Sequence, residues 1–219
     1  MKIKILYEDN HIIGVYKPAG LLTQTDKTGD ISLMDYVKNY LKEKYKKTGN
    51  IFLGMVHRLD RPASGIVLFA KTSKGAARIS EQFRNHLVKK TYHAIVMGKP
   101  KQEKGELINF LEKNRKKRKA LLISSGSNVA ELLYETVSTI ENYSLLKINI
   151  KTGKFHQIRA QLSAVGCPIL GDIKYGASFP LNDKSIALSA TGLTFQTATT
   201  KEKINLSVPI PDSWNKYLR

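Results

Sequence analysis

The sequence predicts an α+β fold with a mostly antiparallel sheet. Segments with the pattern of strands outnumber segments with the pattern of helices, and the two kinds do not alternate regularly along the chain. Two of the strand patterns, 132–140 and 143–150, flank Glu141 and Asn142 as the arms of a β-hairpin flank its turn. The 219 residues contain no internal repeat and no long linker, so we expect a single domain over residues 1–219.

The other strands are predicted from short runs that either alternate apolar and polar residues or are continuously apolar. The run from Gly65 to Ala70 is rich in β-branched and aromatic side chains, which predicts a buried strand. Residues 101–127 are the least regular segment, where we expect short strands at 107–108 and 121–123 with a basic loop insertion between them. The remaining strand patterns cover 3–7, 12–16, 89–97, 187–193 and 204–208.

The first of three predicted helices carries a basic face. Ser32 is the expected N-cap, and Asp35 stands three residues later, in the spacing of a capping box. Apolar residues then recur at helical spacing, and Lys46 and Lys47 are expected in the last turn, where cations favour the helix dipole. The pattern therefore predicts an amphipathic helix that ends before Gly49.

The other two helices are predicted from similar signals. Ser73 is the expected N-cap of a helix that ends near His86. The last helix is expected to run from about residue 155 to residue 165, because Gly166 stands where a left-handed residue commonly ends a helix.

The charge balance is the strongest global signal. The chain has 36 Lys and Arg residues against 18 Asp and Glu residues, a formal net charge of +18. Hydrophobic residues make up 42%, which is enough to build a core and excludes a wholly disordered basic tail. An excess of cations on a compact domain favours nucleic acid as the partner, because each neutralised phosphate releases a counterion. A proteome with many surface lysines is the alternative explanation.

Several other classes are excluded or disfavoured. No apolar run approaches the ~18 residues that cross a bilayer, and the N-terminus lacks the apolar stretch of a signal peptide. Cys167 is the only cysteine, so no intramolecular disulfide and no cysteine-based zinc site can form, and we expect it to pack as a small apolar residue. Trp214 is expected to be a packing anchor. We predict a soluble protein of the cytoplasm.

Two segments, 56–65 and 151–159, place ionisable residues among apolar neighbours, where such groups are costly unless they are paired. Asp60 lies between Arg58 and Arg61, so a neighbouring guanidinium favours its charged form. The alternative is an ordinary turn aspartate that caps backbone amides. His57 and His156 could bind a metal, but their spacing is a weak signal, and hydrogen bonding to the backbone or stacking is the commoner use of such histidines.

These segments resemble the motifs of one enzyme family. The stretch from His57 to Gly65 resembles the H-R-L-D-x-x-T-S-G signature of the pseudouridine synthases of the RluA family. Residues 152–159 and 166–176 are similar to the family's T-G-R-x-H-Q-I-R and G-x-P-I-x-G-D-x-x-Y-G block, and 90–98 to its K-x-Y-x-A-x-V-x-G strand. Near the N-terminus, Lys17 to Leu21 resembles the family's K-P-x-G-L. Together these four ordered motifs are highly specific.

The resemblance implies isomerisation of uridine in rRNA or tRNA to pseudouridine by base flipping, without cofactor or metal. It implies that Asp60 is the catalytic nucleophile, or the covalent partner during base detachment, and it fits both attack on the sugar and assisted formation of a glycal. It further implies that Tyr92 packs against the target base and helps remove the proton from carbon 5. Arg159 is implied to pair with Asp60 and keep it ionised, and Arg58 to enter the RNA stack when the base leaves.

RNA is the implied partner, and no protein partner is evident, so we expect a monomer. The catalytic pattern begins within the first ten residues, so we expect no S4-type RNA-binding domain ahead of it. RNA affinity must then come from the catalytic domain itself, in part from a run of cations that could otherwise be a solvated loop. The predicted RNA-binding residues are Arg58, Lys154, His156, Lys17, Arg115, Lys116, Lys117 and Arg118.

Some positions depart from the family pattern. Ala63 replaces threonine, Lys154 replaces arginine, Gln161 and Ser189 replace histidines, and residues 197–200 lack the usual H-P. Lysine at 154 keeps the cation but loses the bidentate fork. Two alternatives follow: a non-catalytic RNA-binding or ribosome-assembly factor that keeps the fold, and a metal-dependent nuclease that uses Asp60, Asp172 and the histidines.

Overall fold

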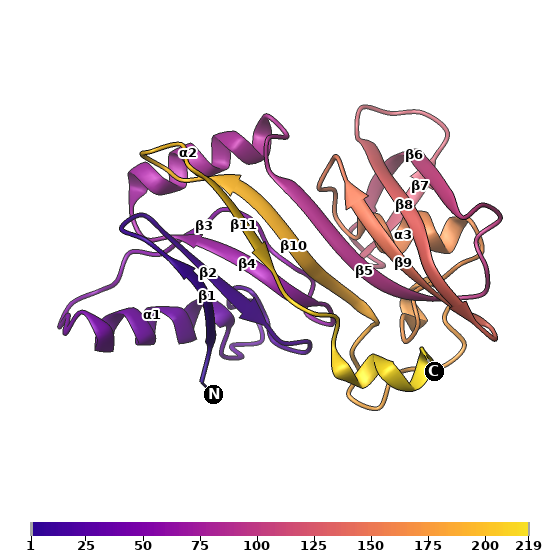
Figure 1. Cartoon of the computed structure of the whole chain (residues 1–219), viewed down its shortest axis with the longest axis horizontal. Helices are drawn as coiled ribbons and strands as arrows, with labels where there is room; N and C mark the ends of the chain where they lie inside the picture. The colour runs from indigo at the N-terminus through magenta and orange to yellow at the C-terminus, as the bar shows by residue number, and fades with distance from the viewer. Residues whose placement is uncertain (1, 219) are drawn as a thin grey trace. The chain divides into compact units, whose positions relative to one another are not determined.

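The computed structural model describes residues 2–218 and shows an α+β architecture (Figure 1). The predicted fold class is confirmed, because α-helices accompany a sheet in which the strand pairs β1–β2, β2–β4, β5–β9 and β8–β9 are all antiparallel. The elements, in chain order, are β1 Lys4–Glu8, β2 Ile12–Lys17, α1 Leu33–Lys44, β3 Gly54–Met55, β4 Ser64–Ala70, α2 Ser73–Arg84, β5 Lys89–Met97, β6 Lys104–Asn114, β7 Lys119–Ile123, β8 Val129–Ile140, β9 Tyr143–Ile150, α3 Gln157–Ala164, the 3₁₀ helix η1 Ile173–Tyr175, β10 Leu188–Gln196, β11 Lys203–Ser207 and the 3₁₀ helix η2 Asp212–Tyr217.

Internal contacts divide the chain into two compact units. The first, here the N-terminal unit, contains the residues up to Val88 together with Gly192–Val208. The second, here the central unit, contains Lys89–Thr191 and the segment from Pro209 onward. Strand β10 contributes residues to both units, so the chain passes between them within one strand. A single domain over residues 1–219 stays a prediction.

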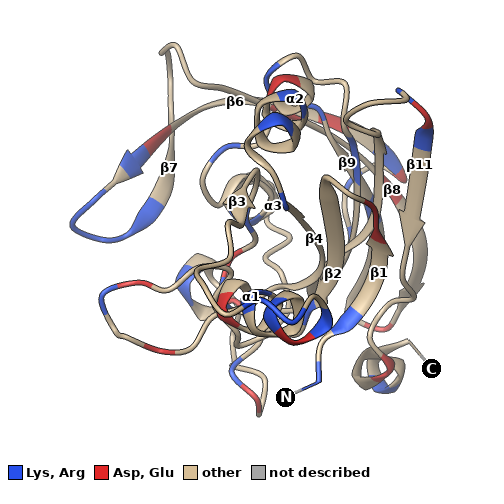
Figure 2. Ribbon diagram, turned by 90° about the vertical axis from the view of Figure 1, so that its left-hand side faces the viewer, with Lys and Arg blue, Asp and Glu red and all other residues tan. Residues whose placement is uncertain are grey.

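The N-terminal unit is built on strands in the order β1-β2-β4-β10, with β11 paired to β10 and β3 paired to β4. Every residue of β4 is buried, as the apolar run predicted. Alternate residues of β2 and β4 point to opposite faces, and the face that carries Ile66 and Leu68 packs against Ile79 of α2 and Phe195 of β10. In Figures 1 and 2, α1 and α2 lie on opposite sides of β2 and β4.

The start of α1 confirms the predicted capping box, because Ser32 and Asp35 each accept a hydrogen bond from the other's backbone. The predicted end was wrong: the helix stops at Lys44, and Lys46 has a left-handed φ of 49°. The N-cap of α2 was also misplaced by one residue. Thr72, not Ser73, caps the helix, because its hydroxyl accepts a hydrogen bond from the backbone N–H of Gly75 at 3.0 Å.

The central unit contains strands in the order β10-β5-β9-β8-β6-β7. β5 has the predicted bounds, and β8 and β9 form the predicted hairpin, in which Ile140 pairs with Tyr143. Both strands predicted in the irregular segment are present, with the basic run between them, but they are longer than predicted: β6 is eleven residues long and pairs with β7 up to Asn114 and Lys119. Charged residues on its exposed positions obscured the alternation, and the expected loop insertion is a tight turn of a long hairpin.

Helix α3 is buried along most of its length and packs against β6, β7 and η1. It begins at Gln157, later than predicted, because His156 has a left-handed φ of 51°. Gly166 follows its end with φ of 77°, as expected. Cys167 and Trp214 are buried, in agreement with their predicted packing roles. Within residues 2–218, no helix is both long and apolar enough to span a membrane.

Candidate active site

Asp60 lies in the loop between β3 and β4, in the N-terminal unit. Its backbone carbonyl accepts a hydrogen bond from the N–H of Ala63 at 3.1 Å, which closes a turn directly before the buried strand. This is the predicted turn, and the side chain of Asp60 is half-buried. Every residue of the strand that follows is buried, so the turn holds Asp60 at the beginning of a firmly packed strand.

Both chain neighbours of Asp60 are fixed to the segment that follows β2. Leu59 exchanges two hydrogen bonds with the Thr23 hydroxyl, at 3.0 and 3.2 Å. Arg61 exchanges two with the backbone of Gly20: its carbonyl accepts at 2.8 Å, and its Nε donates at 2.9 Å. A reactive group needs such support, because small displacements of a catalytic side chain are costly.

Lys17 also helps to hold the Asp60 loop and the segment that follows β2 together. Its side chain has no exposed surface, and its Nζ donates to the carbonyls of Leu21 at 2.7 Å, Pro18 at 3.1 Å and Arg61 at 3.2 Å. These contacts contradict the prediction that Lys17 binds RNA, because a fully buried ammonium with three carbonyl partners cannot reach a phosphate. Burial lowers the pKa of Lys17 to about 7, although the charge of Asp60 raises it.

This burial predicts a pH-dependent stability. Between a folded pKa of about 7 and the ordinary value of 10.5, the unfolded chain binds one proton more than the folded chain at Lys17. The quantity to follow is the free energy of unfolding of the wild type minus that of Lys17→Met. It should increase by roughly 1 kcal/mol for each pH unit from pH 7 to pH 10.5. Urea titrations of both proteins at several pH values measure it. A flat difference would mean that Lys17 keeps its proton in the fold.

His57 and Arg58 take different directions from the same loop. His57 is held inside the unit: its Nε2 accepts a hydrogen bond from the N–H of Leu68 at 2.9 Å, and its ring stacks on Phe83 at 4.8 Å between centroids. Of the uses of His57 considered from the sequence, the structure therefore shows hydrogen bonding to the backbone and stacking. Arg58 is exposed, so it is accessible to RNA.

In the central unit, Tyr92 and Arg159 lie on buried elements. Tyr92 is on β5 and is 9% exposed. Arg159 is on α3 and is 5% exposed, and it forms a bidentate ion pair with Asp172, with Nε–Oδ2 at 2.6 Å and Nη2–Oδ1 at 2.8 Å. The implied pairing of Arg159 with Asp60 stays a prediction. Sequence reasoning missed Asp172 as a partner, although the motif G-D-x-x-Y-G contains it.

Tyr175 joins several parts of the central unit. Its hydroxyl accepts a hydrogen bond from the backbone N–H of Ala120 on β7 at 2.7 Å and contacts Nδ1 of His156 at 2.9 Å. The Arg159 guanidinium lies over its ring at 4.9 Å and the Lys119 ammonium at 4.7 Å. His156, a predicted RNA-binding residue, is half-buried. Its partner Tyr175 is also the residue over whose ring the Arg159 guanidinium lies.

The predicted RNA-binding cations of this unit occupy two places. Lys154 is half-buried in the loop before α3, where its backbone N–H donates to Gln157 Oε1 at 3.0 Å. The residues 115–118 form the exposed turn between β6 and β7, marked by blue segments in Figure 2. The Asn114 side chain accepts from the N–H of Lys117 at 2.8 Å and shapes this turn.

A metal site receives no support from the arrangement of ligands. Within the part of the chain that the structure describes, no three His, Cys, Asp or Glu side chains are grouped so that they could hold a metal ion. The carboxylate of Asp172 accepts both hydrogen bonds of the Arg159 fork.

Comparison with known proteins decides the family. A family profile described as RNA pseudouridylate synthase matches residues 11–164. A ribosomal large subunit pseudouridine synthase C from Rickettsia bellii is 31% identical over 97% of this chain and 70% of the relative. The chain belongs to the RNA pseudouridylate synthase family. A tRNA pseudouridine synthase C from Haemophilus ducreyi is 34% identical over 98% of this chain and 93% of the relative. This confirms the resemblance stated from the motifs, and the chain is an RNA pseudouridine synthase.

Solved structures agree on the fold of this pseudouridine synthase. The human protein RNA pseudouridylate synthase domain containing 4 superposes with a TM-score of 0.79, at 24% identity, over 98% of this chain and 91% of that chain. Human RNA pseudouridylate synthase domain containing 1 gives a TM-score of 0.76, at 19% identity, over 95% of this chain and 83% of that chain.

Three departures of this pseudouridine synthase from the family pattern are packing positions. Ala63, Gln161 and Ser189 are all buried. Gln161 Nε2 lies within hydrogen-bonding distance of the carbonyls of Leu107 and Ala130, at 3.0 and 3.1 Å, so it fastens α3 to the sheet. These substitutions therefore change the interior of each unit and leave Asp60, whose loop is described above, in its motif position.

Proposed function

We propose that this synthase isomerises uridine in structured rRNA or tRNA and that Asp60 is its nucleophile. The bond between N1 of the base and C1′ of the ribose breaks, the base turns, C5 bonds to C1′, and the C5 proton is lost while N1 gains one. Nothing is oxidised, so a carboxylate and a proton acceptor are sufficient. The observation that carries the proposal is Asp60 in the family's H-R-L-D motif, with both chain neighbours hydrogen-bonded in place.

We propose supporting roles for two residues of the central unit. Tyr92 packs against the target base and assists removal of the C5 proton; its position on a buried strand suits a role that needs a fixed ring. Arg159 favours the ionised form of the catalytic carboxylate, as the family motif implies. Its bidentate contact with Asp172 supports this role, because a guanidinium fixed by two bonds is pre-organised to make further contacts.

The substrate proposal rests on the relatives' names and on charge. One relative is named for large-subunit rRNA and another for tRNA, and the net charge of +18 favours a polyanion. The exposed Arg58 is placed to enter the stack when the uridine leaves it, at a cost of a few kcal/mol for unstacking. We propose that the chain works on RNA in the cytoplasm as a monomer.

The turn at residues 115–118 gives a prediction for RNA binding. Lys116→Gln with Lys117→Gln removes two exposed cations, so affinity should fall, and the slope of log K against log salt should become shallower by about 1 to 2. Fluorescence anisotropy with a labelled RNA at several salt concentrations measures both. Lys99→Gln with Lys101→Gln, at exposed positions of the same unit, is the matched control for total charge. An unchanged slope in the first variant would show that this turn does not contact phosphate.

The reaction itself is tested by mixing the protein with total RNA, with and without EDTA, and mapping pseudouridine by carbodiimide modification. Modification that resists EDTA and disappears in Asp60→Asn is the expected result. Binding without modification would favour the non-catalytic assembly factor, and EDTA-sensitive cleavage of the RNA would favour a nuclease. Either result would overturn the proposal.

A further inference from the structure

The N-terminal unit contains an open pocket whose lining includes none of the residues proposed above for catalysis or RNA binding. It lies between the C-terminal end of α1, the segment at residues 51–52 and the chain just before α2, and its volume is about 230 Å³. Leu41 and Ile51 are apolar parts of the lining, with Tyr45 and Phe52 as its aromatic parts. Asn10 and Lys47 contribute polar groups. We refer to this site as the aromatic pocket.

The two aromatic side chains of this pocket are unusually exposed. Tyr45 is 46% exposed and Phe52 is 50% exposed, whereas the aromatic residues of the unit's core, such as Phe69 and Phe195, are almost completely buried. Exposed aromatic rings at the edge of a concave site are available for stacking, and a planar ligand would remove them from water. The volume is sufficient for one nucleobase or a group of similar size.

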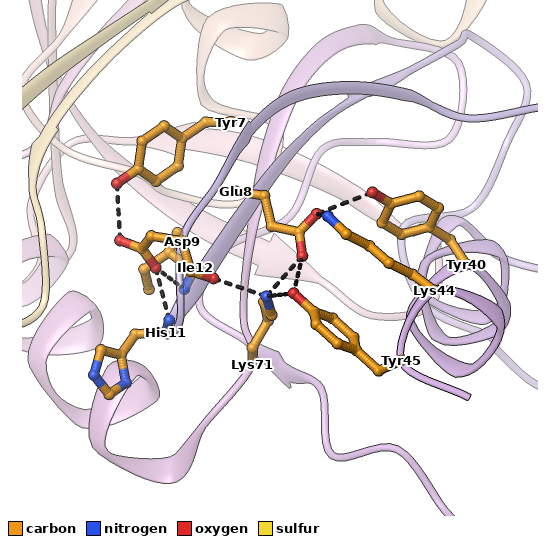
Figure 3. Close-up of polar contacts among 9 residues, drawn as sticks. All are labelled: Tyr7, Glu8, Asp9, His11, Ile12, Tyr40, Lys44, Tyr45 and Lys71. Carbon is orange, nitrogen blue, oxygen red and sulfur yellow. Dashed lines mark hydrogen bonds and ion pairs between the residues drawn. The ribbon is translucent and has the colours of Figure 1, made fainter. Parts of the chain in front are cut away.

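The ring of Tyr45 is held in place although it is exposed (Figure 3). Its hydroxyl donates to Glu8 Oε1 at 2.7 Å and accepts from Lys71 Nζ at 2.9 Å. Glu8 also accepts from Lys71 and Lys44, each at 2.7 Å, and from Tyr40 at 3.0 Å. An aromatic group already fixed by such a network loses little conformational entropy when a ligand stacks on it.

The same network determines the charge state of Glu8, which lies beside the pocket. Burial raises the pKa of Glu8, but hydrogen bonds from Lys44, Lys71, Tyr45 and Tyr40 outweigh it and lower the pKa to about 2, so Glu8 is a carboxylate balanced by two ammonium groups. Lys47 remains as an exposed cation of the lining, and Lys46, its neighbour in the chain, is exposed as well. The described lining of the aromatic pocket contains no carboxylate, so this cation favours an anionic ligand.

We propose that the aromatic pocket binds an unpaired base of the RNA substrate, at a position different from the target uridine. The base would stack on Tyr45 and Phe52, the Asn10 amide is available to its edge, and Lys46 and Lys47 are available to its phosphates. The inference rests on the proposed function insofar as RNA is the substrate. The cluster of lysines favours RNA over an apolar protein segment, which would leave these charges without a partner.

Phe52 provides the sharpest test, because it lines the pocket but takes no part in the Glu8 network. Binding of a labelled, single-stranded oligoadenylate is measured by anisotropy for the wild type, Phe52→Ala, Phe52→Trp and the control Phe179→Ala, which removes a 38% exposed ring from the central unit. We expect Phe52→Ala to bind about tenfold more weakly and Phe179→Ala to bind like the wild type. Phe52→Trp should bind at least as well as the wild type, and stacking should quench the new indole emission.

Oligoadenylate contains no uridine, so this test does not depend on catalysis. Binding that is unchanged in Phe52→Ala, together with unquenched Phe52→Trp, overturns the pocket proposal even if the protein makes pseudouridine. Phe52-dependent binding by a protein that makes no pseudouridine supports the pocket and rejects the proposed function instead. If Phe52→Ala is poorly folded by circular dichroism, the quenching of Phe52→Trp decides.

Discussion

Asp60→Asn is expected to abolish pseudouridine formation, with a fall in rate of at least about 10⁴-fold, the order of loss seen when an enzyme that works through a covalent step loses its nucleophile. Asparagine has the size and shape of aspartate but lacks the negative charge and the nucleophilic oxygen. RNA binding should be unchanged or slightly tighter, because the substitution removes a negative charge near Arg58 and Lys17. Single-turnover assays with saturating enzyme separate the rate of isomerisation from binding.

The matched control is Asp30→Asn, which removes an exposed carboxylate beside the same loop. Asp30 pairs with Arg61 at 2.8 Å, and both side chains are about half exposed, at 50% and 49%, so this surface ion pair should contribute little to stability or rate. Asp30→Asn should therefore retain nearly wild-type activity. If Asp60→Asn kept activity within tenfold of the wild type, Asp60 would not take part in the chemistry.

Local signals predicted most of the fold. The capping box at Ser32, the apolar run of β4 and the alternation of β5 depend only on neighbouring residues, and the structure confirms all three. The length of the strands on either side of residues 115–118 was underestimated because strand pairing, which extends β6 and β7 across charged positions, is a long-range property. Residues 109–114 and 119–120, which were expected in the loop, are held in strands by the pairing of β6 with β7, whereas the basic run 115–118 is the turn.

Chemistry at the site was harder to predict where it depends on burial. Lys17, part of the K-P-x-G-L motif, was predicted to bind RNA, and only the fold shows its three carbonyl partners. The pairing of Arg159 with Asp172 joins a helix to a 3₁₀ helix, and no local pattern specifies that contact. In contrast, Asp60 was already a candidate from its two arginine neighbours, and the H-R-L-D motif added the role of nucleophile, which neighbouring residues do not specify.

Asp172 is the N-cap residue of η1, and this helix connects two functions of the central unit. At its start, Asp172 holds the guanidinium of Arg159; at its end, Tyr175 receives the backbone N–H of Ala120, on the second strand of the basic hairpin. The residue proposed to assist catalysis and the turn proposed to contact phosphate are therefore anchored on Asp172 and Tyr175, the N-cap and the last residue of the same 3₁₀ helix. A change at Asp172 should disturb both.

Asp172→Ala is expected to lower the free energy of unfolding by about 3 to 5 kcal/mol, because breaking a buried ion pair by removing one partner is strongly destabilising. Asp172 is 2% exposed, so its removal leaves the buried Arg159 guanidinium without this carboxylate. Asp172→Asn keeps the size and one acceptor oxygen and should lose less. Urea denaturation of each variant measures the stability, and carbodiimide mapping measures the activity.

The double variant Arg159→Met with Asp172→Leu separates structure from catalysis. Apolar residues of similar size replace the whole ion pair, so the stability should return close to that of the wild type. Isomerisation should still be lost, because the guanidinium is absent from a folded protein, and RNA binding should be largely retained. We expect the same two results for Arg159→Ala. If the double variant regained activity, Arg159 would serve only to balance Asp172, and the carboxylate of Asp60 would have to be kept ionised by the cations of its own unit.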